Sequence, residues 1–485
     1  MLWQTLTLEP YVPYHIMLYI WLPESECTTE IASTKCPQLL YHRVDTDEYT
    51  GAGVTVTAVG NNWNLISGTI WTAGDTNTVE LRLQDIPLGA EVWVDDVILS
   101  RCGMEDFRPV SQRRVDEVRK RTVQLQLGDY GGGPDCTADI TMKKHEYPFG
   151  GAMWDKCATE PECLKFFKKH FNYATAEQSM KWKESEPELG VYTHTDELVL
   201  AAVDKLDLKL RGHTVFWEVP LQVQDWWAMY HRIKRYTNKY GDVTVNDDVD
   251  NEMLHGSFFK ELGVAPNVDV QTWAYKMMAY LVPGKTLFLN DYCMLVYCGP
   301  DITLSSIIKQ AKGFPEAKGI GLQSHVAGGK EGLLQMERKI WVTEMDSQDT
   351  DLHWRGDAYE SFYRAAYASA GVGGMLVWGW ARHDGQWRPD QEMVDENFNF
   401  LEPGQRIFAD DGLLHSEWNS TRHDVYFDDS KVYFDAFPGS YTVEVGDCVG
   451  HFKVPLGMGE MTAVADNWKC DDDGNGRRRK VRDLL

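Results

Sequence analysis

Two glutamates stand at the ends of strand candidates, and the run before Glu344 is strongly apolar. Glu252 follows DDVDN, and Glu344 follows IWVT. A carboxylate at the end of an apolar strand is costly to bury, so it needs a partner or a chemical task. Two carboxyls placed across one glycosidic bond can cleave it, because one donates a proton to the leaving oxygen while the other attacks the anomeric carbon or activates water. For Glu252, the local sequence leaves an alternative open, an exposed glutamate that begins a helix.

A scaffold of several strands must position these residues. From about residue 148 to residue 418, short apolar runs alternate with longer amphipathic stretches, which is typical of a parallel α/β fold. The strand candidates are GGAMW, FNYAT, LKLRGHTVFW, DDVDNE, TLFLNDY, GIGLQSH, KIWVTEMD and GGMLVWGW. Eight such units predict a (β/α)8 TIM barrel, whose chemistry lies at the C-terminal ends of the strands. Glu252, His325 and Glu344 occupy such ends.

The segments on either side of the barrel are predicted to be rich in strands. Residues 1–103 show alternating runs between Gly, Asn and Asp, which predict a β-sandwich of the jelly-roll kind. Residues 104–147 are predicted to form a connector with a basic helix and a β-hairpin from TVQLQL to ADITMKK. Residues 148–418 form the barrel, and residues 419–485 a small β appendage with a disordered tail. We find no internal repeat.

Charge and composition exclude several classes of partner. The formal net charge of −25 disfavours nucleic acid and anionic lipid, because both require a basic surface. The basic clusters RRVDEVRKR and GRRRK are interpreted as solvated faces. No apolar run has the length of a membrane-spanning helix, so no membrane partner is predicted. The 18 tryptophans include more flat rings than a core requires, which suits a neutral substrate such as a sugar chain.

The cysteines indicate an oxidising compartment. Their number, ten, is even, and several lie in local pairs that predict the disulfides Cys157–Cys163, Cys293–Cys298 and Cys448–Cys470. Neither CxxC nor HExxH occurs, so no metal and no cofactor is predicted. The N-terminal stretch lacks a basic start, and Glu9 and two prolines break its apolar run, so it is not interpreted as a signal peptide. With the sequon at Asn419, these features favour a secreted, extracellular protein.

From about residue 115 to residue 418, the chain resembles glycoside hydrolase family 10. The matching motifs, in family order, are FNYATAEQSMKW, LRGHTVFW, DDVDNEMLHG, LNDY, GIGLQSH and WVTEMD. The WE after RGHTVF and the MLHG after Glu252 are similar to the eukaryotic branch. Separately, EVWVDDVIL resembles the closing strand of carbohydrate-binding modules, which implies such a module at the N-terminus. Those modules usually have more strands before this point, which leaves a truncated copy open.

The resemblance implies an endo-β-1,4-xylanase that retains anomeric configuration by double displacement. Glu252 would be the general acid/base and Glu344 the nucleophile. Asn251 would bind the 2-hydroxyl of the reacting sugar, His325 would hydrogen-bond the nucleophile, and Gln323 would be a neighbouring polar contact. Without the motifs, Asn251 reads as a strand-end cap and His325 as a structural histidine.

The resemblance also implies residues that bind the sugar chain. They are the cluster that grips the next sugar unit (Glu177, Gln178, Lys181), the floor of the reacting subsite (His213, Trp217) and its roof (Trp378, Trp387). From the residues alone, both roof tryptophans read as core. The chain departs from the family at Gln178, which stands where the family has Asn, and at Asp247 and Cys293. None of these changes removes a catalytic group, but the longer Gln178 amide puts that subsite in doubt.

Three functions therefore remain open. The first is hydrolysis of xylan, and the second is a β-1,4-glucanase or mixed-specificity glycanase, since the two sugars differ by one hydroxymethyl group. The third is a catalytically impaired carbohydrate-binding protein. The expected partner in each case is a polysaccharide, xylan or a related β-1,4-glycan, and the chain is expected to be a monomer.

Overall fold

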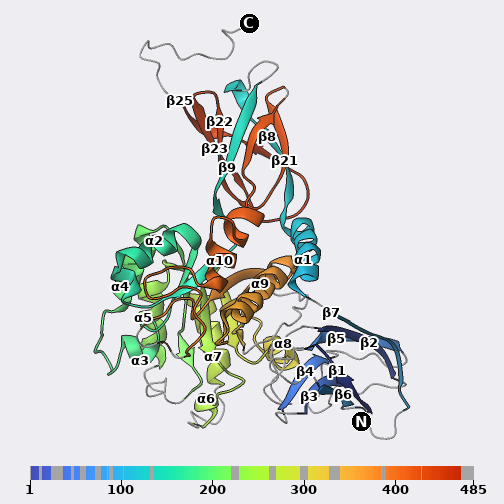
Figure 1. Ribbon diagram of the computed structural model, residues 1–485. Helices are drawn as coiled ribbons and strands as arrows, with labels where there is room; N and C mark the ends of the chain where they lie inside the picture. Colours follow the sequence, from blue (N-terminus) through green and yellow to red (C-terminus); the bar gives the residue numbers. More distant parts are fainter. Residues whose placement is uncertain are drawn as a thin grey trace, which may run out of the picture.

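Three regions follow one another along the chain in this computed structural model: a β-sandwich, a barrel and a second β region that projects from the barrel (Figure 1). The structure describes residues 2–9, 14–22, 37–44, 48–54, 62–70, 78–84, 86, 91–101, 103–130, 136–219, 229–261, 269–294, 304–326, 339–383, 386, 388–427 and 429–470.

The N-terminal region is the predicted β-sandwich. One antiparallel sheet contains β1 (Leu2–Thr7), β6 (Thr78–Gln84), β3 (Gln38–Arg43) and β4 (Glu48–Val54), and the other contains β5 (Asn62–Ile70), β2 (Tyr14–Leu22) and β7 (Trp93–Arg101). Alternate side chains of both sheets fill one core, in which Ile16 and Ile20 of β2 meet Val79 and Leu83 of β6. The alternation of apolar and polar residues in the sequence thus corresponds to one buried face on each strand.

Eight parallel strands form the predicted barrel in the middle of the chain. They are β10 (Phe149–Met153), β11 (Tyr173–Ala176), β12 (Lys209–Gly212), β14 (Thr244–Asn251), β15 (Thr286–Asp291), β16 (Ala317–Leu322), β18 (Lys339–Ser347) and β19 (Val372–Val377). Each strand pairs in parallel with the next, and the pairing of β19 with β10 closes the ring. The (β/α)8 prediction is confirmed.

Helices surround the barrel (Figure 1). The longer ones are α2 (Pro161–His170), α4 (Asp196–Lys205), α5 (Met229–Tyr240), α7 (Val270–Leu281), α8 (Leu304–Gly313) and α9 (Leu352–Ala368). The shorter ones are α3 (Trp182–Ser185), α6 (Phe258–Glu261) and α10 (Glu402–Phe408). Asp351 begins α9 by accepting hydrogen bonds from the amides of His353 and Trp354. In the described part of the chain, no helix combines the length and apolar character needed to cross a membrane.

The third barrel strand differs from the prediction, because LKLRGHTVFW is not one continuous strand. β12 ends at Gly212, and pairing resumes at β13 (Phe216–Trp217). The buried carboxylate of Asp248 holds the interruption in place, since it accepts hydrogen bonds from Arg211 and from Nδ1 of His213 at 3.0 Å. The interruption turns the His213 ring toward the inside of the barrel end, where it lies near the ring of Trp378.

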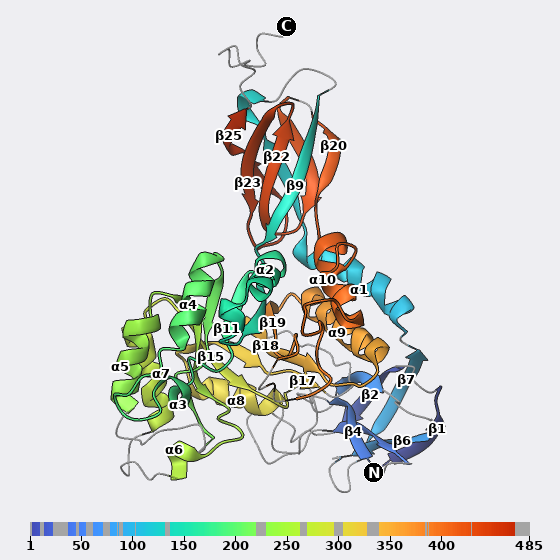
Figure 2. The ribbon, with the colours of Figure 1, turned by 60° about the vertical axis from the view of Figure 1, so that its left-hand side comes forward.

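The predicted β-hairpin between residues 122 and 144 is wrong. β8 (Arg121–Gln126) pairs with β21 (Lys431–Ala436) and β24 (Met461–Val464). β9 (Thr137–His145) lies in the other sheet (Figure 2), together with β20 (Arg422–Tyr426), β22 (Gly439–Val445), β23 (Cys448–Val454) and β25 (Asp466–Cys470). Each of the two strands buries apolar side chains against C-terminal strands in one shared core.

The connector and the appendage are therefore one structural unit built from both sides of the barrel sequence. α1 (Met104–Arg119) attaches it to the barrel: the buried Arg119 guanidinium donates to the carbonyl oxygens of Tyr367 at 2.6 Å and Val372 at 2.9 Å. The boundaries at residues 103, 147 and 418 stay predictions. The tail from residue 471 lies outside the described residues.

Two of the three predicted disulfides are confirmed, Cys157–Cys163 and Cys448–Cys470. Cys293 is disulfide-bonded, but its predicted partner, Cys298, lies outside the described residues. Cys136 is a free cysteine.

A histidine pair, with His170 buried and His415 half-buried, lies between α2 and the turn that follows α10. Nδ1 of His170 is 2.8 Å from Nε2 of His415, which lies in the π-helical turn Leu413–Glu417. The His170 ring packs beside the rings of Phe166 and Phe408. Burial lowers the pKa of His170 from its ordinary value of 6.5 to about 3, so the folded state holds this ring neutral.

We expect this burial to make the fold sensitive to acid. Between pH 6.5 and about 3, the unfolded state binds a proton at His170 that the folded state does not, so stability is present above pH 6.5 and is lost as the pH falls. His170→Phe should reduce the slope of unfolding free energy against pH in this window, by up to about 1.4 kcal/mol per pH unit. Denaturant unfolding between pH 4.5 and 7 measures it. The exposed His423→Phe is the control, and equal slopes in wild type and His170→Phe would contradict the prediction.

Candidate active site

The two predicted carboxylates lie at the same end of the barrel. Glu252 follows the last residue of β14, and Glu344 lies near the C-terminal end of β18. Both side chains are buried, with exposed fractions of 9% and 5%. Glu252 has a φ of +60°, a backbone conformation that residues with a side chain seldom adopt. A sharp turn at the strand end therefore directs the Glu252 carboxyl.

Side-chain amides connect the two carboxylates in a chain of hydrogen bonds. Nε2 of Gln323 donates to Oε1 of Glu252 and to Oδ1 of Asn251, at 3.2 Å each. Nδ2 of Asn290 donates to the same Asn251 oxygen at 2.9 Å and to Oε1 of Glu344 at 2.7 Å. Since four strand ends contribute to this chain, the barrel geometry fixes the relative positions of the carboxyls.

The surroundings of Glu252 favour its protonated form. Burial raises the pKa of Glu252 above its ordinary value, and the negative charge of Glu344 raises it further. The indole Nε1 of Trp217 donates to Oε2 of Glu252 at 2.7 Å, which opposes the rise without cancelling it. Glu252 is therefore suited to carry a proton to a leaving group.

The surroundings of Glu344 favour its ionised form. Burial alone would raise the pKa of Glu344, but His213, His325 and the Asn290 amide outweigh it and hold the pKa at about 2. Nε2 of His325 lies 3.4 Å from Oε2 of Glu344, and Nδ1 of His213 lies 3.9 Å from Oε1. Glu344 is thus an anion above about pH 2, and its pKa is lowered while that of Glu252 is raised.

His325 is positive because a second carboxylate supports it. Burial would lower the pKa of His325, but Asp346, at 2.6 Å from Nδ1, together with Glu344 raises it to about 9. Arg388 pairs with the other oxygen of Asp346 at 2.7 Å. A cation is therefore held against the Glu344 carboxylate across the neutral and mildly acidic range.

The structure brings together some of the residues predicted to bind the sugar chain. The buried Lys181 places Nζ at 4.7 Å from the ring centroid of Trp217 and 5.6 Å from that of Trp378, so predicted floor and roof residues meet around one ammonium group. Glu177 is buried beside them, whereas the side chain of Gln178 is exposed. Trp387 lies outside the described residues. The roles of these residues stay predictions.

The sequence analysis did not include Asn290 and His383 among the site residues. Asn290 contacts Glu344 directly, and Nε2 of His383 lies 3.4 Å from Oε2 of Glu177. A signal for Asn290 existed, since it ends the apolar run TLFLN as Asn251 ends its own strand. His383 had no such signal, because it follows the last barrel strand in a polar segment.

Asp247 departs from the family pattern without entering the site. Its buried carboxylate accepts a hydrogen bond from the hydroxyl of Tyr236 on α5 at 2.9 Å and lies 3.6 Å from Nζ of Lys285. Cys293 is occupied by its disulfide. Asp247 and Cys293 are therefore both engaged in structural contacts.

A closed parallel barrel that presents one carboxyl with a raised pKa and one with a lowered pKa at its C-terminal end has the site of a glycoside hydrolase. Residues 138–402, more than half of the 485, match Glycosyl hydrolase family 10, and the chain belongs to this family.

Several curated proteins are similar to the chain. Endo-1,4-beta-xylanase 2 of Arabidopsis thaliana is 26% identical over 84% of this chain and 40% of its own length. Endo-1,4-beta-xylanase 1 of the same plant is 29% identical over 75% of this chain and 42% of its own length. Anti-sigma-I factor RsgI6 of Acetivibrio thermocellus is 27% identical over 69% of this chain and 46% of its own length. The chain thus spans about half the length of these relatives.

Among solved structures, a psychrophilic glycoside hydrolase family 10 endo-beta-1,4-xylanase is 21% identical and covers 53% of this chain and 94% of its own, with a TM-score of 0.45.

Replacing His325 should change the acid limb of the pH profile. His325→Asn removes a cation from Glu344, so the pKa of Glu344 rises and the nucleophile becomes protonated at higher pH. We expect the acid limb of kcat/KM to move up by about one pH unit or more. Rates on an aryl glycoside between pH 3 and 7 measure it. His353→Asn, at an exposed histidine paired with Glu402, is the matched control, and an unmoved acid limb in folded His325→Asn would refute the role.

Proposed function

We propose that the chain is a retaining endo-β-1,4-xylanase. The observation that carries the proposal is the opposite protonation of Glu252 and Glu344 within one chain of amide hydrogen bonds. Membership of family 10 supports it, as do the relatives described as endo-1,4-beta-xylanases. Since the chain spans about half the length of those relatives, the activity is proposed from the site itself.

In the first step, the Glu344 carboxylate attacks the anomeric carbon while Glu252 transfers its proton to the glycosidic oxygen. The bond to the leaving sugar breaks, and a glycosyl ester of Glu344 forms. Once this ester has removed the negative charge of Glu344, the pKa of Glu252 falls, because that charge had raised it. Glu252 is then a carboxylate that accepts a proton from water as the water attacks the ester.

Asn251 and Asn290 assist this sequence from fixed positions. Asn290 donates to Glu344 and to Asn251, so its amide orients both groups. Asn251 is fully buried between the two carboxylates, where its amide can meet the 2-hydroxyl of the reacting sugar. Such a contact strengthens as positive charge develops on the sugar ring.

The proposal predicts distinct losses for the two carboxylates. Glu344→Gln should lower kcat on soluble xylan by roughly 10⁴-fold or more, because the nucleophile is lost. Glu252→Ala should lower it by roughly 10² to 10⁴-fold, and less on an aryl glycoside whose leaving group needs no proton. NMR of the first product should show retained configuration. The exposed Glu197→Gln is the control, and undiminished release of reducing ends by Glu344→Gln would exclude the mechanism.

A substrate panel separates xylanase from the alternatives. Rates on xylan, carboxymethyl cellulose and mixed-linkage glucan compare a xylosyl with a glucosyl unit in the same site. Faster cleavage of the glucans would identify a β-1,4-glucanase or a mixed-specificity enzyme. Xylan binding without turnover between pH 4 and 8 would identify an impaired carbohydrate-binding protein.

The N-terminal sandwich has an aromatic face that supports a second function, binding of the polysaccharide. Trp21 of β2 is in register with Trp63 of β5 on one side and Trp93 of β7 on the other. The rings of Trp21 and Trp93 stack at 4.8 Å, and Trp63 and Trp93 are 41% and 53% exposed. Glu91 accepts a hydrogen bond from the indole of Trp93 at 3.2 Å, so that ring is held in place. Exposed apolar rows of this kind mark ligand-binding faces.

This tryptophan row predicts binding that does not depend on catalysis. In the full chain carrying Glu344→Gln, the double change Trp63→Ala and Trp93→Ala should lower binding to insoluble xylan by roughly ten-fold, since each ring contributes apolar contact area. Sedimentation of the protein with xylan measures it. Trp3→Ala is the matched control, because Trp3 is 65% exposed on β1 of the opposite sheet. Equal losses in the control and the double variant would argue against the row.

An extracellular location and a monomeric state belong to the same proposal. Two disulfides, Cys157–Cys163 and Cys448–Cys470, favour an oxidising compartment. A polysaccharide substrate is consistent with action outside the cell, and a single chain contains both carboxylates of the proposed site.

A further inference from the structure

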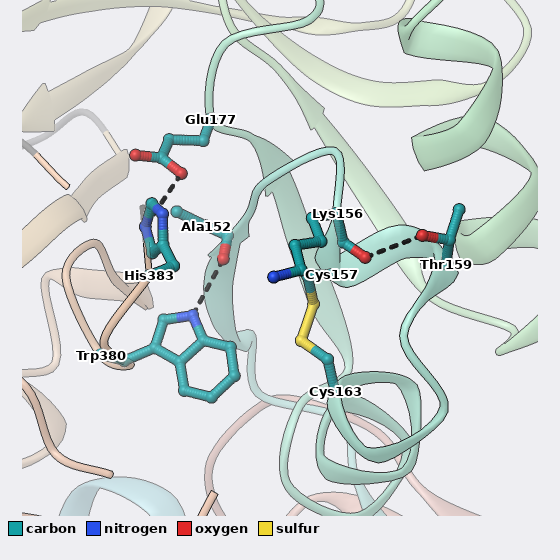
Figure 3. Close-up of a disulfide and its surroundings, with 8 residues drawn as sticks. All are labelled: Ala152, Lys156, Cys157, Thr159, Cys163, Glu177, Trp380 and His383. Atoms are coloured by element: carbon teal, nitrogen blue, oxygen red, sulfur yellow. Dashed lines mark hydrogen bonds and ion pairs between the residues drawn. A yellow bond between two sulfur atoms is a disulfide. The ribbon is translucent and has the colours of Figure 1, made fainter. Parts of the chain in front are cut away.

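Glu177 is a buried carboxylate beside the catalytic pair that contacts a histidine from another strand end. It follows β11 and is 4% exposed, and its amide donates to the carbonyl oxygen of Met153 at 3.0 Å. Oε2 of Glu177 lies 3.4 Å from Nε2 of His383, which follows β19. The other oxygen points away from His383 (Figure 3). One oxygen is therefore held by the imidazole while the second can accept a hydroxyl hydrogen bond.

The His383 ring is fixed by aromatic packing. It stacks on Trp154, which follows β10, with centroids 4.3 Å apart and planes 9° from parallel. Trp154 in turn packs at 5.5 Å against Trp380, whose indole donates to the carbonyl oxygen of Ala152 at 2.9 Å. The Cys157–Cys163 disulfide closes the turn just after Trp154 (Figure 3). The imidazole thus has one orientation, with Nε2 toward Glu177.

The contact between Glu177 and His383 matters because the Glu177 carboxyl is buried. Burial raises the pKa of Glu177, and Asp155 adds to the rise, whereas His383 and Lys181 oppose it. Lys181 is shared, because Glu344 and Glu252 also act on its ammonium group. His383 contacts Glu177, and among the described residues no contact joins it to Glu252 or Glu344.

We propose that His383 is a positioning residue that orients Glu177 for binding the sugar unit next to the reacting one. The inference rests on the proposed function, in which Glu177 grips that unit. His383 acts through Glu177 and takes no part in bond breaking. Loss of this imidazole contact removes one of the two groups that favour a single orientation of the buried carboxylate, the other being Lys181, and the sugar hydroxyl then meets it in a less favourable orientation. The consequence falls on binding of longer substrates and leaves the chemical step unchanged.

Two substitutions separate the N–H donor from the ring. His383→Phe keeps a flat ring on Trp154 but has no donor. His383→Gln loses the ring but keeps an N–H group at a similar reach. Arg382→Ala is the control in the same segment, because Arg382 is 56% exposed and pairs with Glu392.

The first measurement is xylotriose binding by calorimetry, in the full chain carrying Glu344→Gln. His383→Phe should weaken binding by roughly ten-fold, the effect of one lost polar contact to a charged group, while His383→Gln stays within about two-fold. The second measurement uses chains with Glu344 intact. There His383→Phe should raise KM on xylan with little change in kcat, and kcat/KM on an aryl xyloside, which has a single sugar, should be unchanged.

Unchanged xylotriose binding in His383→Phe would overturn the positioning role, and so would an equal loss in His383→Gln, since that result assigns the effect to ring packing. A fall in kcat on the aryl xyloside would overturn it as well. If the parent chain neither binds xylotriose nor cleaves xylan, the proposed function itself fails. If the parent chain is active and His383→Phe matches it, only the inference about His383 fails.

Discussion

The end of this barrel depends on burying two carboxylates together while keeping a proton on only one of them. Glu252 and Glu344 are both nearly inaccessible to water, and burial raises the pKa of each. The difference comes from their partners, because Glu344 faces His213 and His325 whereas Glu252 faces the neutral indole of Trp217. Two glutamates thus obtain opposite pKa shifts because, in the described part of the chain, histidines lie against only one of them.

The architecture around the pair follows from that requirement. The interruption between β12 and β13 turns His213 inward, and the buried Asp248 carboxylate fixes it there. Asp346 and Arg388 support His325 from behind. Away from the barrel, β8 and β9 cross to sheets made from C-terminal strands, so residues on both sides of the barrel sequence join in one unit. The sandwich carries a row of tryptophans across β5, β2 and β7, for which polysaccharide binding is proposed.

Several features were determined by the sequence itself. Eight apolar runs separated by amphipathic stretches specified the barrel, because period and length are local properties. The strand-end positions of Glu252 and Glu344 followed from those runs. The disulfides Cys157–Cys163 and Cys448–Cys470 were predicted because their cysteines lie in local pairs along the chain. Alternation in the first 103 residues specified a sandwich, since each strand buries one face.

Other features were decided only by the tertiary structure. Alternation shows that β8 and β9 are strands, but it carries no information on their partners, which lie about 300 residues away in the chain. The contact of His383 with Glu177 joins residues from opposite ends of the barrel sequence. The protonation of Glu252 and Glu344 depends on distances between groups from several strands. Coulombic and hydrogen-bond energies are set by separation in space, and separation along the chain does not fix it.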